Sequence, residues 1–186
     1  MLRERGQGGG CGYEKRSFTY HNSFIVADWN SAIILETAGR DYAVEAVSGA
    51  RSISNGLTIP EFSHAHSDTV NTTRSGSRSR QKRTQSLAND AVSVQDIIAI
   101  LQDHGENHEH PHYSMFNGGL HAPCVHAGGM AKNSQTTASW VAELREDSHQ
   151  QWVTATSAPC TSLYKPIQVD TPLDLPTAED KFNDSL

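Results

Sequence analysis

The chain of 186 residues lacks several features that define common classes of protein. No apolar run approaches the roughly 20 residues that a membrane-spanning helix needs. The three cysteines, Cys11, Cys124 and Cys160, are odd in number and widely spaced, which disfavours a disulfide framework and predicts reduced thiols in the cytoplasm. Residues 1–12 are charged and then glycine-rich without an apolar core, so we expect no secretory signal peptide.

An excess of positive charge is also missing. There are 15 Lys and Arg residues and 21 Asp and Glu residues, and the formal net charge of -6 disfavours nucleic acid and acidic membranes as partners. Hydrophobic residues make up 36% of the chain, charged residues 19%, and the mean hydropathy is -0.54. These values are polar for a globular chain but do not indicate overall disorder. They predict several elements joined by long loops around a thin core.

Short apolar runs closed by turn residues predict antiparallel strands. Four of them follow one another at 22–28, 32–37, 41–47 and 51–59. Two further strand-like segments, 136–144 and 151–156, flank a polar connection that is typical of a hairpin. Strands, one helix and then more strands favour an α+β layered domain.

The strongest helix signal covers residues 94–104. Ser93 is a good N-cap and Asp96 lies three residues later, as in a capping box with a short acidic side chain. An apolar stripe is expected to face a sheet, with Gln95, Gln102 and Asp103 outward and Gly105 ending the helix. The stripe consists of Val94, Ile97, Ile98 and Leu101.

Residues 60–91 show no clean period, and the polar run 72–83 fits either a loop or a polar helix. The run has five basic residues: Arg74, Arg78, Arg80, Lys82 and Arg83. One of its arginines is a candidate to bind a substrate carboxylate or to orient a nucleophile, because a planar guanidinium suits both tasks. A nucleic-acid patch is disfavoured by the acidic total and the absence of interleaved aromatics. A solvated surface is the ordinary alternative.

Histidines gather in the second half of the chain and raise the question of a zinc site. Ligand sets usually have fixed spacing on a rigid element, whereas His108, His110 and His112 alternate in a loop without an accompanying cysteine pair. We therefore predict no designed metal site and no cofactor, with His126 in a structural role. The full set is His104, His108, His110, His112, His121 and His126.

Four blocks of sequence together resemble the secernin and dipeptidase family of N-terminal-nucleophile hydrolases. In this order and at these spacings they cover most of the chain. The blocks are Gly6-Gln7-Gly8-Gly9-Gly10-Cys11-Gly12 with His21-Asn22-Ser23-Phe24; Leu35-Glu36-Thr37-Ala38-Gly39-Arg40 leading into residues 51–59; Cys124-Val125-His126-Ala127-Gly128-Gly129 with Gln135-Thr136-Thr137; and residues 152–160 running on to Lys165-Pro166.

The resemblance implies an αββα sandwich whose nucleophile is a cysteine at the mature N-terminus, with its own α-amine as general base. It also implies that residues 1–169 are an incomplete domain of this kind without its N-terminal nucleophile segment, and that 170–186 are an irregular acidic tail or the start of a truncated C-terminal part. The implied activity is hydrolysis of dipeptides or small amides, with this chain an inactive fragment. A non-catalytic secernin-like regulatory or interaction protein is the alternative. Membranes and nucleic acid are not expected partners.

Two residues are the candidates for catalytic work. Asn55 follows an expected strand and precedes Gly56, and the resemblance implies that its amide donates to the oxyanion formed when an amide carbonyl is attacked. A turn asparagine that caps its own backbone is the alternative. Arg80 is chosen from the basic run, in which Ser75-Gly76 matches a Ser-Gly pair of the family. Cys11 is expected to be structural, and Cys124 and Cys160 to be buried inert thiols.

Overall fold

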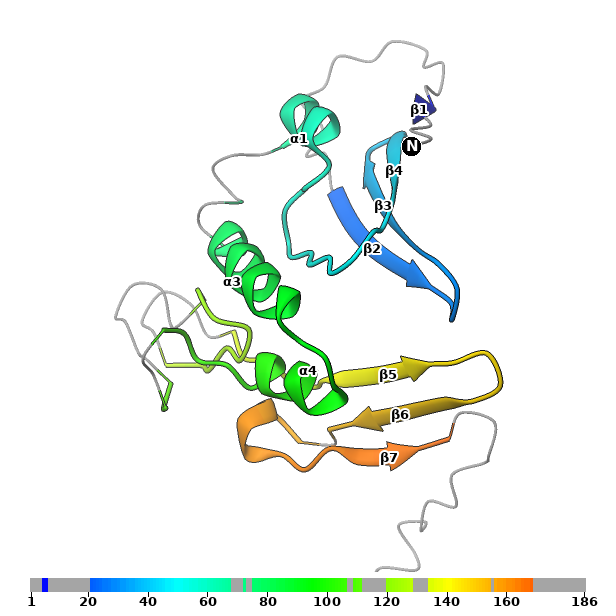
Figure 1. The fold of residues 1–186 in the computed structure, drawn as a ribbon. Helices are drawn as coiled ribbons and strands as arrows, with labels where there is room; N and C mark the ends of the chain where they lie inside the picture. Colours follow the sequence, from blue (N-terminus) through cyan, green and yellow to red (C-terminus); the bar gives the residue numbers. More distant parts are fainter. Residues whose placement is uncertain are drawn as a thin grey trace, which may run out of the picture.

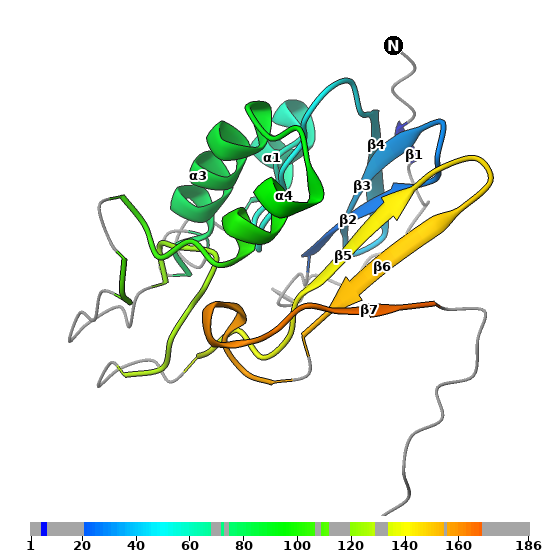
Figure 2. The same cartoon turned by 60° about the horizontal axis from the view of Figure 1, so that its bottom comes forward.

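The computed structural model describes residues 5–6, 21–67, 72, 75–106, 109–111, 120–128, 134–154 and 156–168. In this part of the chain it has two antiparallel sheets and the helices α1, α3 and α4 (Figure 1). The predicted α+β class is confirmed. Figure 2 shows the helices gathered on one side and the strands of both sheets on the other. None of the described helices is long and apolar enough to cross a bilayer.

The first sheet has the strand order β1-β4-β3-β2 and confirms three of the predicted strands. A hairpin at one edge pairs β2 with β3, from His21 opposite Ala38 to Ala27 opposite Ala32. The Asp28 carboxylate closes the connecting turn by accepting from the backbone N–H groups of Asn30 and Ser31 at 2.8 and 2.6 Å. The four strands are β1 (Arg5–Gly6), β2 (His21–Ala27), β3 (Ala32–Ala38) and β4 (Asp41–Ala46).

One face of this sheet carries the main apolar core. Ile34, Glu36 and Ala38 alternate along β3 and are all buried, as the period of two in a strand requires. The segment 57–62 covers them through Leu57, Ile59 and Phe62, the last on α1 (Pro60–His66). Pro60 suits the first turn of this helix because its missing N–H has no partner there in any case.

The prediction of a fourth strand over 51–59 is wrong. This segment forms no strand and bends at Asn55, and three of its backbone N–H groups bond to side chains. Ser52 N donates to Gln85 Oε1 at 2.8 Å, while Thr58 N and Ile59 N donate to the two oxygens of Glu36 at 2.6 and 3.0 Å. A composition rich in β-branched residues cannot distinguish such side-chain partners from a neighbouring strand.

Helices α3 (Ser77–Asn89) and α4 (Val94–Leu101) form the rest of the helical layer. The capping box that begins α4 is confirmed: Asp96 N donates to Ser93 Oγ at 3.2 Å and Ser93 N donates to Asp96 Oδ2 at 2.9 Å. The helix ends three residues earlier than predicted. Its apolar stripe is less covered than predicted: Ile98 is only half-buried, Ile97 is 36% exposed, and no residue of α4 is fully buried.

Residues Gln102 and Asp103 were expected to point outward, and that expectation is wrong. The Gln102 amide donates to Pro159 O at 2.9 Å, and the Asp103 carboxylate receives Arg83. The polar end of the helix therefore connects α4 to α3 and to the short 3-10 helix Pro159–Thr161. A periodicity argument assigns polar residues to solvent and cannot anticipate such partners.

The second sheet has the order β5-β6-β7 and confirms the predicted hairpin. Its strands are β5 (Trp140–Leu144), β6 (His149–Val153) and β7 (Lys165–Ile167). Residues 136–139 were expected to belong to the first strand but lie outside it, since Thr136 N donates to Val125 O in a loop. β7 was not predicted because it contains Pro166, which an edge strand tolerates. The 170–186 tail and Cys11 lie outside the described residues.

Glu36 offers a direct test of this packing. Its fully buried carboxylate accepts from Thr58 N, Thr58 Oγ1, Ile59 N and Ser23 Oγ. Glu36→Gln replaces one acceptor oxygen by a donor and leaves buried N–H or O–H groups unpaired, which should cost about 2–4 kcal/mol of unfolding free energy.

The matched control is Glu143→Gln, whose carboxylate pairs with the exposed Arg145 on the surface of β5. Removing this pair should change stability by less than about 1 kcal/mol. Urea unfolding of both variants measures the difference. Equal losses would show that Glu36 does not anchor the 57–59 segment.

Candidate functional site

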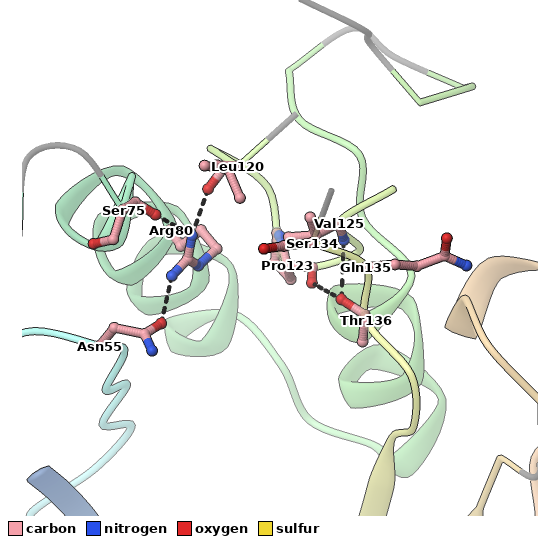
Figure 3. Close-up of a pocket in the computed structure, with 9 residues that line it drawn as sticks. All are labelled: Asn55, Ser75, Arg80, Leu120, Pro123, Val125, Ser134, Gln135 and Thr136. Carbon is pink, nitrogen blue, oxygen red and sulfur yellow. Dashed lines mark hydrogen bonds between the residues drawn. The ribbon is translucent and has the colours of Figure 1, made fainter. Parts of the chain in front are cut away.

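A pocket of about 350 Å³ lies where the bend at Asn55, the start of α3 and the loops 120–125 and 134–136 meet (Figure 3). We call it the Arg80 pocket. It brings together the two residues singled out from the sequence, Asn55 and Arg80, which lie on different segments. The lining residues are Asn55, Ser75, Arg80, Leu120, Pro123, Val125, Ser134, Gln135 and Thr136.

The Arg80 guanidinium connects three segments of chain. Nη1 donates to the backbone oxygens of Ser75 and Leu120 at 2.7 and 2.6 Å, and Nη2 donates to Asn55 Oδ1 at 2.6 Å. A guanidinium has five N–H donors, so these three bonds leave two, one on Nη2 and one on Nε. Arg80 therefore has donor capacity to spare at the pocket wall.

The charge of Arg80 has no carboxylate partner among the described residues. Its three acceptors are two carbonyls and an amide oxygen, which are neutral. Burial lowers the pKa of the Arg80 guanidinium from its ordinary value, but an arginine stays charged in proteins. A partly buried, uncompensated cation with free donors is a site for an anion, and a carboxylate fits the planar fork.

The hydrogen bond from Arg80 also fixes the orientation of the Asn55 amide. Since an arginine can only donate, the Asn55 atom that it contacts must be the oxygen. The Asn55 amide nitrogen then has two donors with no acceptor in the described part of the chain. An amide group held in this way can donate to a developing oxyanion, provided that a carbonyl is bound within reach.

Gly76 allows α3 to begin beside the pocket. Its φ of 65° lies in the left-handed region, which glycine adopts without strain. A Cβ built on Gly76 would lie 2.6 Å from Leu120 O, the same oxygen that accepts from Arg80. The absence of a side chain therefore lets the 120 loop approach α3 closely enough for Arg80 to bind it.

The remaining basic residues of the run do not join Arg80. Arg83 makes a two-point pair with Asp103, with Nη2 to Oδ1 at 2.6 Å and Nε to Oδ2 at 2.5 Å. This bond raises the pKa of Arg83. Arg78 and Lys82 are exposed on α3, and Arg74 lies outside the described residues.

Thr136 joins the opposite wall of the pocket. Its hydroxyl accepts from Val125 N at 3.0 Å and donates to Pro123 O at 3.1 Å, so it holds the tight turn at 123–125 in place. Pro123 and Val125 line the pocket, and Cys124 between them does not. Among the lining residues there is no thiol and no histidine, so the described part of the pocket supplies no nucleophile activated by a base.

Cys124 instead lies in a second group of side chains, which we call the Cys/His cluster. It consists of His104, Cys124, His126 and Cys160, and one ligand-type atom from each lies within 4.8 Å of the others. His126 Nε2 lies 3.3 Å from Cys124 Sγ and 3.2 Å from Cys160 Sγ. The rings of His104 and His126 have centroids 5.2 Å apart.

Burial disfavours the charged forms of two members of this cluster, Cys124 and His126. Burial raises the pKa of the Cys124 thiol to about 11, while Cys160 lowers it through its backbone N–H and raises it through its thiol. Burial also lowers the pKa of His126, as does the proximity of His104. A thiol with a raised pKa is a poor nucleophile, which agrees with its place away from the pocket.

The sequence-based prediction concerned the 108–112 loop and did not consider that a cysteine pair could join His104 and His126. Cys124 and Cys160 are distant in sequence but contact the same nitrogen of His126. The signal that was present is the close spacing of Cys124 and His126, which are two residues apart in the sequence. Cys160 and His104 could not be joined to it from sequence, since only tertiary packing brings them there. His108 and His112 lie outside the described residues, and His110 is exposed.

Comparisons with family models and with solved structures assign no family to the chain. No protein-family model matches the chain. No solved structure matches it either.

Gly76 provides a test of how the Arg80 pocket is built. Gly76→Ala should lower the unfolding free energy by roughly 3 kcal/mol or more, because it combines left-handed strain with a collision against Leu120 O. Gly49→Ala is the matched control, with φ of 72° and no atom within 4 Å of the added Cβ. It should cost only about 1 kcal/mol, the strain alone. Thermal unfolding compares them, and losses of equal size would contradict the close approach of the 120 loop.

Proposed function

We propose that this chain carries the substrate-orienting part of a secernin-like dipeptidase site. In this proposal Arg80 binds the carboxylate of a dipeptide or a similar small amide, and Asn55 donates to the carbonyl oxygen that becomes the oxyanion. The observation that supports it is the Arg80–Asn55 hydrogen bond of 2.6 Å beside a pocket, made by a cation that has no acidic partner in the described residues.

The proposed division of work follows from charge. A guanidinium with two spare N–H groups matches the two oxygens of a terminal carboxylate. Binding at that end places the neighbouring amide bond next to Asn55, whose nitrogen can then stabilise negative charge as it develops on the carbonyl oxygen. Because this stabilisation is greatest in the transition state, it would raise the rate of hydrolysis more than it tightens substrate binding.

The same proposal includes the αββα sandwich of the family. The face of the first sheet opposite the core is apolar and accessible: Phe24, Val26, Ile33 and Tyr42 are 36–54% exposed. A sheet that is apolar on both faces is suited to a middle layer between helices and a second sheet. This arrangement remains a proposal, as does a cytoplasmic location for a chain with reduced thiols.

A non-catalytic protein that binds peptides is the second candidate. The observation that favours it is the absence of a thiol among the residues lining the pocket. Amide hydrolysis without a metal needs a nucleophile and a base in contact, and an oxyanion donor does not replace them. We therefore expect the chain to bind dipeptides through the Arg80 pocket without cleaving them.

Arg80→Gln tests the carboxylate-binding role. The variant removes the charge and should weaken binding of a dipeptide with a free C-terminal carboxylate by at least about tenfold, since a charge-assisted bond contributes roughly 1.5–3 kcal/mol. Arg78→Gln, a change at an exposed position of the same helix, should leave binding unchanged. Titration calorimetry of both variants, with the thermal unfolding of each checked first, gives the comparison.

The same titration is repeated with a dipeptide whose C-terminus is amidated, and its result can contradict the proposal. The wild-type chain should bind it at least about tenfold more weakly, because the carboxylate is gone. Equal affinity for both ligands, or no binding of either, would contradict the proposal.

Catalysis is tested separately with a panel of dipeptides. We expect no turnover above buffer by the chain, because none of its described pocket residues is an activated nucleophile. Turnover that disappears in Cys11→Ser would identify Cys11 as the nucleophile and contradict this expectation. In that case Asn55→Ala should lower kcat by about 100- to 1000-fold, the usual effect of removing one oxyanion donor.

A further inference from the structure

We propose that His104, Cys124, His126 and Cys160 bind one Zn²⁺ ion in a closed structural site. Two thiolates and two imidazoles are a donor set typical of structural zinc. Binding would release the two thiol protons, so two thiolate charges balance the 2+ charge of the ion and the two histidines bind as neutral ligands. The site would then be electrically neutral in its partly buried surroundings.

The geometry of the Cys/His cluster is close to that of a tetrahedral site. Zinc bonds of about 2.0–2.1 Å to nitrogen and 2.3 Å to sulfur place tetrahedral ligand atoms roughly 3.3–3.8 Å from one another. His126 Nε2 lies 3.3 and 3.2 Å from the two sulfurs, and all four ligand-type atoms fall within 4.8 Å. Shifts of an ångström or less would complete the tetrahedron.

His104 provides a separate observation. Its Nε2 is buried and has no hydrogen-bond partner among the described residues. A buried ring nitrogen without a partner is costly, and a metal ion is one of the few groups that would satisfy it here. Cys124 is 2% exposed, and His104, His126 and Cys160 are half-buried, so the cluster is partly shielded from solvent.

Hydrogen bonds outside the cluster bring the three ligand-bearing segments together. Cys124 N donates to Asp103 O at 3.1 Å, which fixes Cys124 beside His104. The two-point pair with Arg83 holds Asp103 itself. The hydrogen bond from Gln102 Nε2 to Pro159 O holds the neighbouring Cys160 near the end of α4. Such supporting contacts orient the first ligands of metal sites and strengthen the case for a built site.

The ion would stabilise the wall of the Arg80 pocket. The chain turns tightly at Cys124, where Val125 N donates to Pro123 O at 3.1 Å, and Cys124 belongs to the cluster while its two neighbours Pro123 and Val125 line the pocket. Thr136 bonds to both Pro123 and Val125. Zinc would therefore not contact a bound peptide. It would connect the end of α4, the 123–126 segment and Cys160.

Metal content of the full chain is the first test. After expression with added zinc and dialysis against reductant, elemental analysis should give about one equivalent of zinc per chain. Co²⁺ added to the metal-free chain should show the intense visible bands of a tetrahedral site and thiolate charge transfer. A folded wild-type chain that retains no zinc and gives no such Co²⁺ spectrum would overturn the proposal.

Variants locate the site. His104→Ala combined with Cys160→Ser should abolish stoichiometric zinc and the tetrahedral Co²⁺ spectrum. The control combines Cys11→Ser with His121→Ala, which changes one residue of each type outside the cluster and should retain both. Zinc that persists at one equivalent in the cluster variant would overturn the assignment, as would its loss in the control.

Two measurements on the wild-type chain keep the test independent of whether the variants fold. A chelator should lower the melting temperature by several degrees, and stoichiometric zinc should restore it. Thiol titration of the folded metal-bound chain should show Cys124 and Cys160 protected, and reactive once the chelator is added. A disulfide between these two cysteines, detected by mass spectrometry without reductant, would overturn the proposal.

Discussion

The contacts of the Arg80 guanidinium are the constraint on which the candidate site depends. One side chain binds the Ser75 carbonyl of its own helix start, the Leu120 carbonyl of a distant loop and the Asn55 amide of the bend before α1. Three segments with no regular backbone pairing between them are thereby brought to one place. Because the acceptors are neutral, the charge that organises the pocket remains available to a ligand.

Two further side chains support this arrangement from outside. Glu36 holds the 57–59 segment against the first sheet, which fixes the chain that carries Asn55. Thr136 holds the 123–125 segment on the opposite wall. Both side chains accept from backbone N–H groups that have no partner in a strand or helix. These hydrogen bonds position the 57–59 and 123–125 segments. A buried carboxylate is an unusual anchor, and it is suited here because it accepts from several donors at once.

The local features of this fold could be predicted from sequence because they depend on neighbouring residues. The paired strands of both hairpins and the Ser93–Asp96 capping box follow from periodicity and short-range hydrogen bonding. The segment 51–59 could not be predicted, since its donors bond to Glu36 and Gln85, which are distant in sequence. Asn55 and Arg80 were candidates from a resemblance, and their hydrogen bond depends on tertiary packing. The same reason explains why Cys160 and His104 could not be joined to Cys124-Val125-His126.

A crystal structure of the chain with a non-hydrolysable dipeptide analogue would show which groups hold the carboxylate and the carbonyl oxygen of a bound peptide. The account predicts the C-terminal carboxylate on Nη2 and Nε of Arg80, with the neighbouring carbonyl oxygen within hydrogen-bond distance of the Asn55 amide nitrogen. An analogue bound elsewhere would contradict the account. So would an Arg80 guanidinium turned away from Asn55 to pair with an acidic side chain of the chain itself.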